Sequence, residues 1–454
     1  MLMKLYFFSL LLHLSLQIQY LFVYEHCRHG ARSPPFSPSS SYIDEFGTKW
    51  FGDGELTTIG QRMHHIIGIR SRLKYSSLLS PSFNSKEIII TSTNSNRTIT
   101  SVMAQLYAMY PIGSGDVLSD SELKLAYPPN KMTEEVKQEV EKLGNDVIYG
   151  KVPLIPVHNF DMTKKYVFLN EASECPSMKE YQEELKNKST LNAFLSKLNN
   201  TFGDELQSYF HKDNRDFIFD FNSIISITDN FISNIDNGKD ISSFTSLIDK
   251  DSFYQMAIEL KTIFLYEMKV DAKTSKLAST PYMRDLLIWM QNRIALDKEG
   301  KADQVNYTMP KMVIHSGHDT SLAPIEMFMK VVFDTKYKYV SFASNVFFEL
   351  YKDDNGNYKV SYLIDDELML TISFDEFKSK IEENIMSDDD IEHFCYVKVD
   401  DERDKTIKTF IIMTITFAST TLLFLISTII FYIKSRKTSK KQSKAPLLPS
   451  EIYN

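Results

Sequence analysis

Cysteine is scarce in this chain, with three residues among 454. Three are few for a secreted domain, and they exclude a fold that is held together mainly by disulfides. The fold must therefore rest on a buried core, and 43% hydrophobic residues over this length are ordinary for one or two packed domains. Spacing alone does not show which of Cys27, Cys175 and Cys395 would pair.

The sequence also lacks a set of Cys, His, Asp and Glu residues at metal-ligand spacing. His26 and the pair His64–His65 come nearest, and we expect surface or packing roles for them. No metal and no other cofactor is therefore predicted.

Basic charge is missing from most of the chain. The net charge is −8, but the last 21 residues carry six Lys or Arg against one Glu, which leaves −13 for everything before them. A phosphate backbone demands a basic surface, so this acidity argues against a nucleic-acid partner.

The first 19 residues resemble a secretory signal peptide. Lys4 precedes a short apolar run of the length expected for the hydrophobic region of such a peptide. No Ala-x-Ala cleavage site follows, so an uncleaved anchor is the alternative.

The second apolar segment, residues 409–433, is 25 residues long and carries no charge. This length predicts one transmembrane helix, and the lysines on both sides of it argue against a buried core helix. The basic tail 434–454 is then cytoplasmic, and the large domain is lumenal or extracellular. The chain would be a single-pass type I membrane protein of the lysosome, endosome or cell surface. Glycosylation sequons at Asn187, Asn199 and Asn306 fit a lumenal surface.

Three strand–loop–helix units are predicted along the chain. They cover 20–25 with 57–73, 87–92 with 98–110, and 311–316 with 320–332. In the first helix, apolar residues from Ile59 to Leu73 recur at helical spacing and predict its buried face. Alternating strands and helices predict an α/β fold, a mostly parallel, doubly wound sheet with helices on both faces, whose loops gather catalytic residues at the carboxyl ends of the strands.

Other segments complete the predicted architecture. Side chains facing the two sides of a strand alternate along residues 342–352, and a turn leads into 358–364, which predicts a hairpin. A capping box at Ser373 predicts the start of a helix that ends at about residue 385. Residues 134–294 indicate a mainly helical insertion. The predicted core spans 20–175 and 295–400, with a helical cap at 176–294 that shapes the substrate entrance.

Residues 28–34, directly after the first strand, place two guanidiniums and an imidazole within five positions. Arginine forks bind phosphate oxygens in pairs, Gly30 allows close approach of the backbone, and Pro34 stiffens the loop. A solvated turn could show the same residues. Arg97 after the second strand, and His318 and Asp319 after the third, favour a phosphate pocket. Nearby guanidiniums would keep His29 neutral, as a nucleophile requires.

These motifs resemble the histidine acid phosphatases, branch 2 of the histidine phosphatases. The family signature Arg-His-Gly-x-Arg-x-Pro appears at 28–34. Further similar segments lie at 54–60, 92–98, 153–158 and 316–320, and the likeness covers roughly residues 20 to 395.

The resemblance implies hydrolysis of phosphate monoesters. His29 would attack phosphorus and become a phosphohistidine, and Asp319 would protonate the leaving group. Arg28, Arg32, Arg97 and His318 would hold the phosphoryl oxygens, without a metal. A protonated Asp319 and a partly protonated phosphate would favour acidic pH. The family likeness also implies a disulfide between Cys175 and Cys395, whereas Cys27 would be a structural or a redox-sensitive residue.

Other readings stay open. A phytase-like member of the family would typically carry Asn where Ser321 follows the His-Asp-Thr triplet. The motif at 32–34 argues against a mutase-like role, and a catalytically silent, membrane-anchored binding protein on the same fold is the alternative from another class. The natural substrate and the oligomeric state, with a homodimer as one candidate, are not fixed by the sequence.

Overall fold

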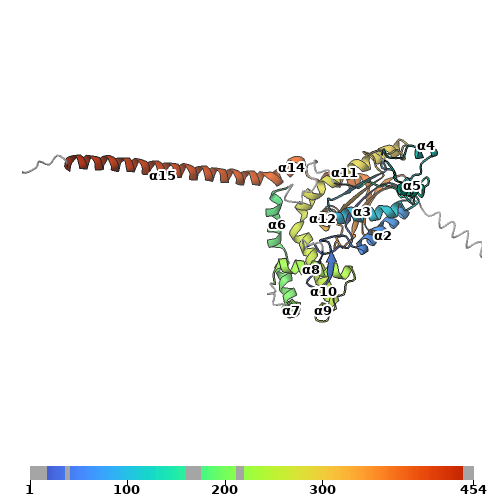
Figure 1. Ribbon diagram of the computed structural model, residues 1–454, viewed down its shortest axis with the longest axis horizontal. Helices are drawn as coiled ribbons and strands as arrows, with labels where there is room; N and C mark the ends of the chain where they lie inside the picture. Colours follow the sequence, from blue (N-terminus) through green and yellow to red (C-terminus); the bar gives the residue numbers. More distant parts are fainter. Residues whose placement is uncertain (1–17, 36–40, 130, 160–174, 211–218, 443–454) are drawn as a thin grey trace, which may run out of the picture. The chain divides into compact units, whose positions relative to one another are not determined.

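The computed structural model describes residues 18–35, 41–129, 131–159, 175–210 and 219–442 (Figure 1). The predicted signal peptide falls almost wholly outside these residues. The chain divides into two units, residues 1–388 and 389–454, and each is described by itself.

A seven-stranded mixed sheet forms the centre of the first unit, in the order β5-β4-β6-β1-β7-β8-β9. Its strands are β1 (Gln19–Arg28), β4 (Ile88–Ser92), β5 (His158–Asn159), β6 (Met312–Gly317), β7 (Asn345–Lys352), β8 (Tyr358–Ile364) and β9 (Glu367–Ser373). β5, β4, β6 and β1 are parallel, whereas β7, β8 and β9 follow as an antiparallel meander. The α/β class is confirmed, but the sheet is less parallel than predicted because short turns join its last three strands.

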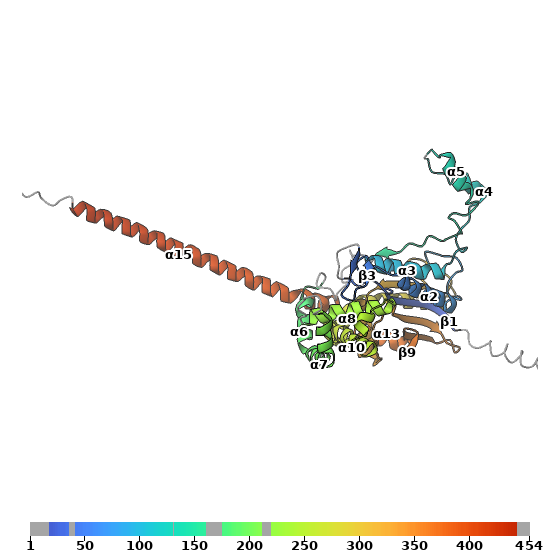
Figure 2. The same ribbon diagram turned by 60° about the horizontal axis from the view of Figure 1, so that its bottom comes forward.

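Helices cover both faces of this sheet (Figure 2). Successive residues of β1 point to opposite faces. Val23 packs with residues of α3 (Asn96–Met109) and with Tyr75, which caps the end of α2 (Thr58–Lys74), whereas Tyr24 packs on the other side. That other side is covered by α11 (Ala272–Lys298), α12 (Asp319–Phe333) and α13 (Phe374–Glu382), the last capped by Ser373 as predicted.

The predicted buried face of α2 is only partly right: Ile67 is buried and Met63 is half-buried, but the other apolar residues of the set are exposed. Ile66 and Leu73 are 56% and 73% exposed, whereas Gly60, His64 and Gly68 are buried. The reason is the close approach of α3, because a Cβ on Gly68 would lie 2.1 Å from the carbonyl oxygen of Gln105. Small residues, not large apolar ones, allow two helices to pack this closely.

The insertion has a core of its own, rich in phenylalanine. Phe46, Phe194, Phe231, Phe244 and Phe253 are among its buried residues. They pack between the helices α7 (Leu191–Phe210), α8 (Phe221–Asp236), α9 (Ser242–Thr245) and α10 (Lys250–Ile263) and the β2–β3 hairpin (Ser41–Ile43 and Lys49–Phe51). α6 (Ser177–Lys188) precedes α7, and a π-helical turn, Phe264–Lys269, follows α10.

The end of α11 packs on the sheet although its residues fall within the predicted cap. Met283, Leu287 and Met290 are buried with strand residues. By contrast, the short helices α4 (Asp120–Leu123) and α5 (Glu134–Glu141) bury no residue. The division into core and cap stays a prediction.

The second unit contains α14 (Asp388–Glu392), a π-helical turn, His393–Val397, and the long helix α15 (Lys398–Gln442). Within α15, Thr409–Arg436 is long and apolar enough to cross a membrane and is not buried. This stretch contains the predicted span.

The cysteines and sequons lie as follows. Cys175 and Cys395 are disulfide-bonded, as the family resemblance implied, and Cys27 is buried and free. The sequon asparagines are all exposed, and their glycosylation stays a prediction.

A buried carboxyl on α12 makes the stability of the fold depend on pH. Glu326 is fully buried and accepts hydrogen bonds from the Tyr266 hydroxyl (3.1 Å) and the Lys338 backbone N–H (2.8 Å). Burial raises its pKa from 4.5 to about 8. The folded state thus keeps a proton that the unfolded state loses, so this group's contribution is full below pH 4.5 and is lost as pH rises through 8.

We therefore expect Glu326→Gln to lose less stability than the wild type between pH 5 and pH 9. Thermal unfolding of both proteins at the two pH values measures this. The exposed Glu141→Gln is the control and should retain the wild-type pH dependence; an equal dependence in Glu326→Gln would contradict the prediction.

Candidate active site

Three loops meet at the carboxyl edge of the sheet, as predicted. Arg28 at the end of β1 pairs with Gly317 at the end of β6, so His29 and His318 leave their strands at the same level. Their ring centroids lie 5.5 Å apart. β4 pairs with β6 on its other side, which brings the loop before Arg97 to the same edge. Arg28, His29 and Arg32 are only 3–6% exposed.

Glycine fixes the shape of the first loop. A Cβ on Gly30 would lie 2.4 Å from the backbone oxygen of Gly60, and a Cβ on Gly60 would lie 2.2 Å from that of Ala31. The loop and the first turn of α2 therefore touch backbone to backbone, and the Thr57 N–H donates to the oxygen of Ala31 (3.0 Å). His64, on the next turn, lies 3.0 Å from the oxygen of Arg28, which gives it the packing role that was expected.

His29 is held in the form that a nucleophile needs. Its Nδ1 lies 2.9 Å from the oxygen of Gly30, so Nδ1 carries the proton and Nε2 keeps a lone pair. Burial, followed by the charges of Arg28 and Arg32, lowers the pKa of His29 well below its usual value. The imidazole therefore stays neutral in mildly acidic solution.

His318 and Arg97 lie next to each other beside His29. His318 Nε2 lies 3.0 Å from the Thr93 hydroxyl, and burial lowers the pKa of His318 to about 4. Arg97 approaches His318 Nδ1 at 3.5 Å and makes no ion pair with any described residue. Its guanidinium is thus a cation whose charge an incoming anion would balance.

Arg28 holds the predicted acid in its ionised form. Its Nη2 lies 3.0 Å from Asp319 Oδ2, and its guanidinium lies over the Phe342 ring, 4.4 Å from the centroid. Burial favours a raised pKa for Asp319, but the charges of Arg28 and Lys261 outweigh it and hold the pKa below its usual value. The protonated Asp319 expected from the sequence is therefore not the form that this pocket favours without a bound anion.

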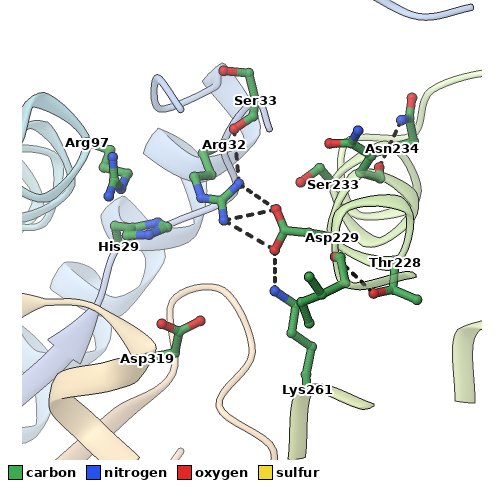
Figure 3. A network of polar contacts seen from close by, with 12 residues as sticks. His29, Arg32, Ser33, Arg97, Thr228, Asp229, Ser233, Asn234, Lys261 and Asp319 are labelled. Carbon is green, nitrogen blue, oxygen red and sulfur yellow. Dashed lines mark hydrogen bonds and ion pairs between the residues drawn. The ribbon is translucent and has the colours of Figure 1, made fainter. Parts of the chain in front are cut away.

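Arg32 meets a partner that the sequence did not reveal. Its two terminal nitrogens lie 3.2–3.4 Å from the carboxylate of Asp229 on α8, and Lys261 on α10 pairs with the same carboxylate (Figure 3). Both partners belong to the helical insertion, about 200 residues from Arg32. The sequence feature that could have indicated this partner is a stripe of polar residues on α8, but such a stripe is also the pattern of a solvent-exposed helix face.

The charged side chains that line the pocket are mainly cations. Within the described ranges, no group of three or more His, Cys, Asp and Glu residues is placed to hold a metal ion. The arrangement suits an anion with several oxygens, next to a neutral imidazole and a carboxyl group.

Comparison with known proteins agrees with this chemistry. The model of the histidine phosphatase superfamily (branch 2) matches residues 22–365. Lysosomal acid phosphatase of Rattus norvegicus is 24% identical over 342 residues, covering 73% of this chain and 67% of the relative. Prostatic acid phosphatase of Mus musculus is 24% identical over 340 residues, covering 74% and 76%. Klebsiella sp ASR1 phytase superposes with a TM-score of 0.52 over 82% of this chain and 96% of its own, at 14% identity, which shows the fold alone.

The charge on Arg97 leads to a binding prediction. A hydrogen bond to a charged group contributes roughly 1.5–3 kcal/mol, so Arg97→Ala should weaken binding of inorganic phosphate about 10- to 100-fold. Isothermal titration of the purified protein with phosphate at pH 5.5 measures this. Arg62→Ala, on the exposed surface of α2, should bind phosphate like the wild type. Equal affinities for all three proteins would show that Arg97 does not face the anion.

Proposed function

The chain belongs to branch 2 of the histidine phosphatase superfamily, and from this premise we propose that it is an acid phosphatase that hydrolyses phosphate monoesters through a phosphohistidine at His29. The observation that carries the proposal is a neutral His29, with a free Nε2 lone pair, beside three arginines and a carboxyl group. Phosphoryl transfer depends mainly on positioning and on charge neutralisation, which this pocket offers.

In the first step, Arg28, Arg32, Arg97 and His318 bind the phosphoryl oxygens, and His29 Nε2 attacks phosphorus. The bond from phosphorus to the ester oxygen breaks, and that oxygen takes a proton from Asp319. In the second step, water attacks the phosphohistidine and gives a proton back to Asp319. Inorganic phosphate leaves, and His29 regains its lone pair.

An acidic optimum follows from two groups with opposite needs. His29 must be neutral, and its lowered pKa keeps it so in acid. Asp319 must be protonated, and a bound phosphate dianion raises its pKa, because the anion offsets the charge of Arg28. Lower pH therefore protonates Asp319 while His29 remains neutral.

The setting proposed for this activity is outside the cytosol. The disulfide, the exposed apolar stretch Thr409–Arg436 and the similarity to lysosomal acid phosphatases support a single-pass membrane protein with a lumenal or extracellular catalytic domain. A phytase-like specificity is the second candidate within the family. It is supported only at the level of the fold, by likeness to a phytase.

Full-length protein, purified in detergent, tests the proposal with p-nitrophenyl phosphate across pH 4 to 8. We expect activity on the acidic side, and His29→Ala should lose about 1,000-fold or more, as enzymes do without their nucleophile. Rapid quenching with ³²P-labelled substrate should trap an acid-labile phosphoprotein in the wild type. His65→Ala, a partly exposed neighbour on α2, is the control and should stay active. An inactive wild type would favour the silent binding protein instead.

The role of Asp319 can be separated by leaving group. A general acid contributes roughly 100- to 10,000-fold, mostly when the leaving alkoxide is a poor one. Asp319→Asn should therefore lose far more activity on an alkyl phosphate than on p-nitrophenyl phosphate, whose leaving group needs no proton. The ratio of kcat/KM for the two substrates measures this. If Asp319→Asn lowers kcat/KM equally for both substrates, Asp319 is not the proton donor.

A further inference from the structure

One helix of the insertion buries polar side chains where a core helix would bury apolar ones. Its polar stripe consists of Asp229, Asn230, Ser233, Asn234 and the capping residue Asn237, all of which are at most 7% exposed. The opposite stripe of α8, with Ile224, Ile227 and Phe231, packs into the phenylalanine core.

The polar stripe of α8 binds the catalytic loop and the β2–β3 hairpin. Asn237 donates to the backbone oxygen of Arg32 (3.2 Å), and Asn234 donates to Asp44 (2.7 Å). Asp44 also accepts from the indole of Trp50 (2.8 Å) and does not contact Arg32. These contacts fix α8 against the loop from two sides.

At one end of this stripe, Asp229 reaches the Arg32 side chain. Figure 3 shows Arg32 between His29 and Asp229, so the carboxylate meets the guanidinium on the side away from the proposed nucleophile. Both terminal nitrogens of Arg32 contact Asp229, and one also donates to the oxygen of Ser33 (3.1 Å). An arginine held at its end is fixed in one orientation, with its other edge free to face the pocket.

Lys261 offsets the negative charge of Asp229. Its ammonium pairs with Asp229, and the lysine side chain is 12% exposed. The two residues together carry no net charge, so Asp229 can hold Arg32 while adding little net negative charge near the phosphate.

We propose that Asp229 is a positioning residue, which orients Arg32 for the phosphoryl group and places this part of the phosphate site under the control of the helical insertion. The proposal rests on the proposed function in taking phosphate as the anion. Asp229 does not touch the substrate; it acts through Arg32. Two other roles would predict different results: a carboxylate that competes with phosphate for Arg32, and a buried ion pair that only stabilises the fold.

The test is the affinity for inorganic phosphate, measured by titration of the full-length protein at pH 5.5, which needs no turnover. Asp229→Asn alone also changes the local charge, so the informative variant is D229N/K261M, which removes one charge of each sign. We expect it to bind phosphate about 10-fold more weakly, as residues that orient a ligand-binding group commonly cause. The same pair of changes made in Arg32→Ala should cause no further loss, because the group that they position is gone.

Three controls distinguish the loss of Arg32 positioning from a general disturbance of the fold. Glu259→Gln on α10 breaks an exposed ion pair with Lys197 (2.7 Å) and should leave phosphate affinity unchanged. Lys261→Met keeps the pair between Arg32 and Asp229 and should lose less affinity than the double variant. Thermal unfolding checks that each variant folds, and D229S/K261M, which removes the same two charges, replaces D229N/K261M if that variant does not fold.

The proposal is overturned if D229N/K261M binds phosphate as the wild type does or more tightly, since a competing carboxylate predicts tighter binding. It is also overturned if the loss is the same with and without Arg32, as a purely structural role predicts. A failure of the proposed function looks different: His29→Ala would retain activity while these affinities stayed measurable.

Discussion

The burial of positive charge around His29 is the constraint on which the rest of the pocket depends. Arg28, Arg32 and Lys261 are nearly buried and share two carboxylates, those of Asp319 and Asp229, while Arg97 has no ion-pair partner in the described part of the chain. Buried charges are costly unless they are paired. These four cations exceed the two carboxylates by two positive charges, which an anion with two negative charges would balance.

The same cations influence the protonation of His29 and Asp319. Burial and the nearby cations lower the pKa of His29, which keeps its imidazole neutral in acid. At Asp319 burial favours the protonated form, but the charges of Arg28 and Lys261 outweigh it and hold the carboxyl ionised. The arginine charges thus lower the pKa of both groups, so that each is deprotonated when no anion is bound. An anion bound between the arginines would offset their charges and raise both pKa values.

Sequence reasoning reached the convergence of the three loops because parallel neighbouring strands end at one edge, and the pairing of Arg28 with Gly317 follows that rule. It failed to predict the contact between Arg32 and Asp229, which lie far apart in the sequence. Asp229 reaches Arg32 from a different core, and its polar stripe has the pattern of a solvated face. It failed on α2 for another reason: apolar periodicity predicts burial, but close packing against α3 selected Gly68 and left Ile66 exposed.

The loop at 28–34 is held by neighbouring elements on two sides. The backbone contact of Gly30 with Gly60 fixes the loop from α2, and Asn237 and Asp229 fix it from α8. One support belongs to the α/β core and the other to the insertion. Under the proposal that Asp229 orients Arg32, variation in the insertion would change how Arg32 is presented while the loop that carries His29 stays the same.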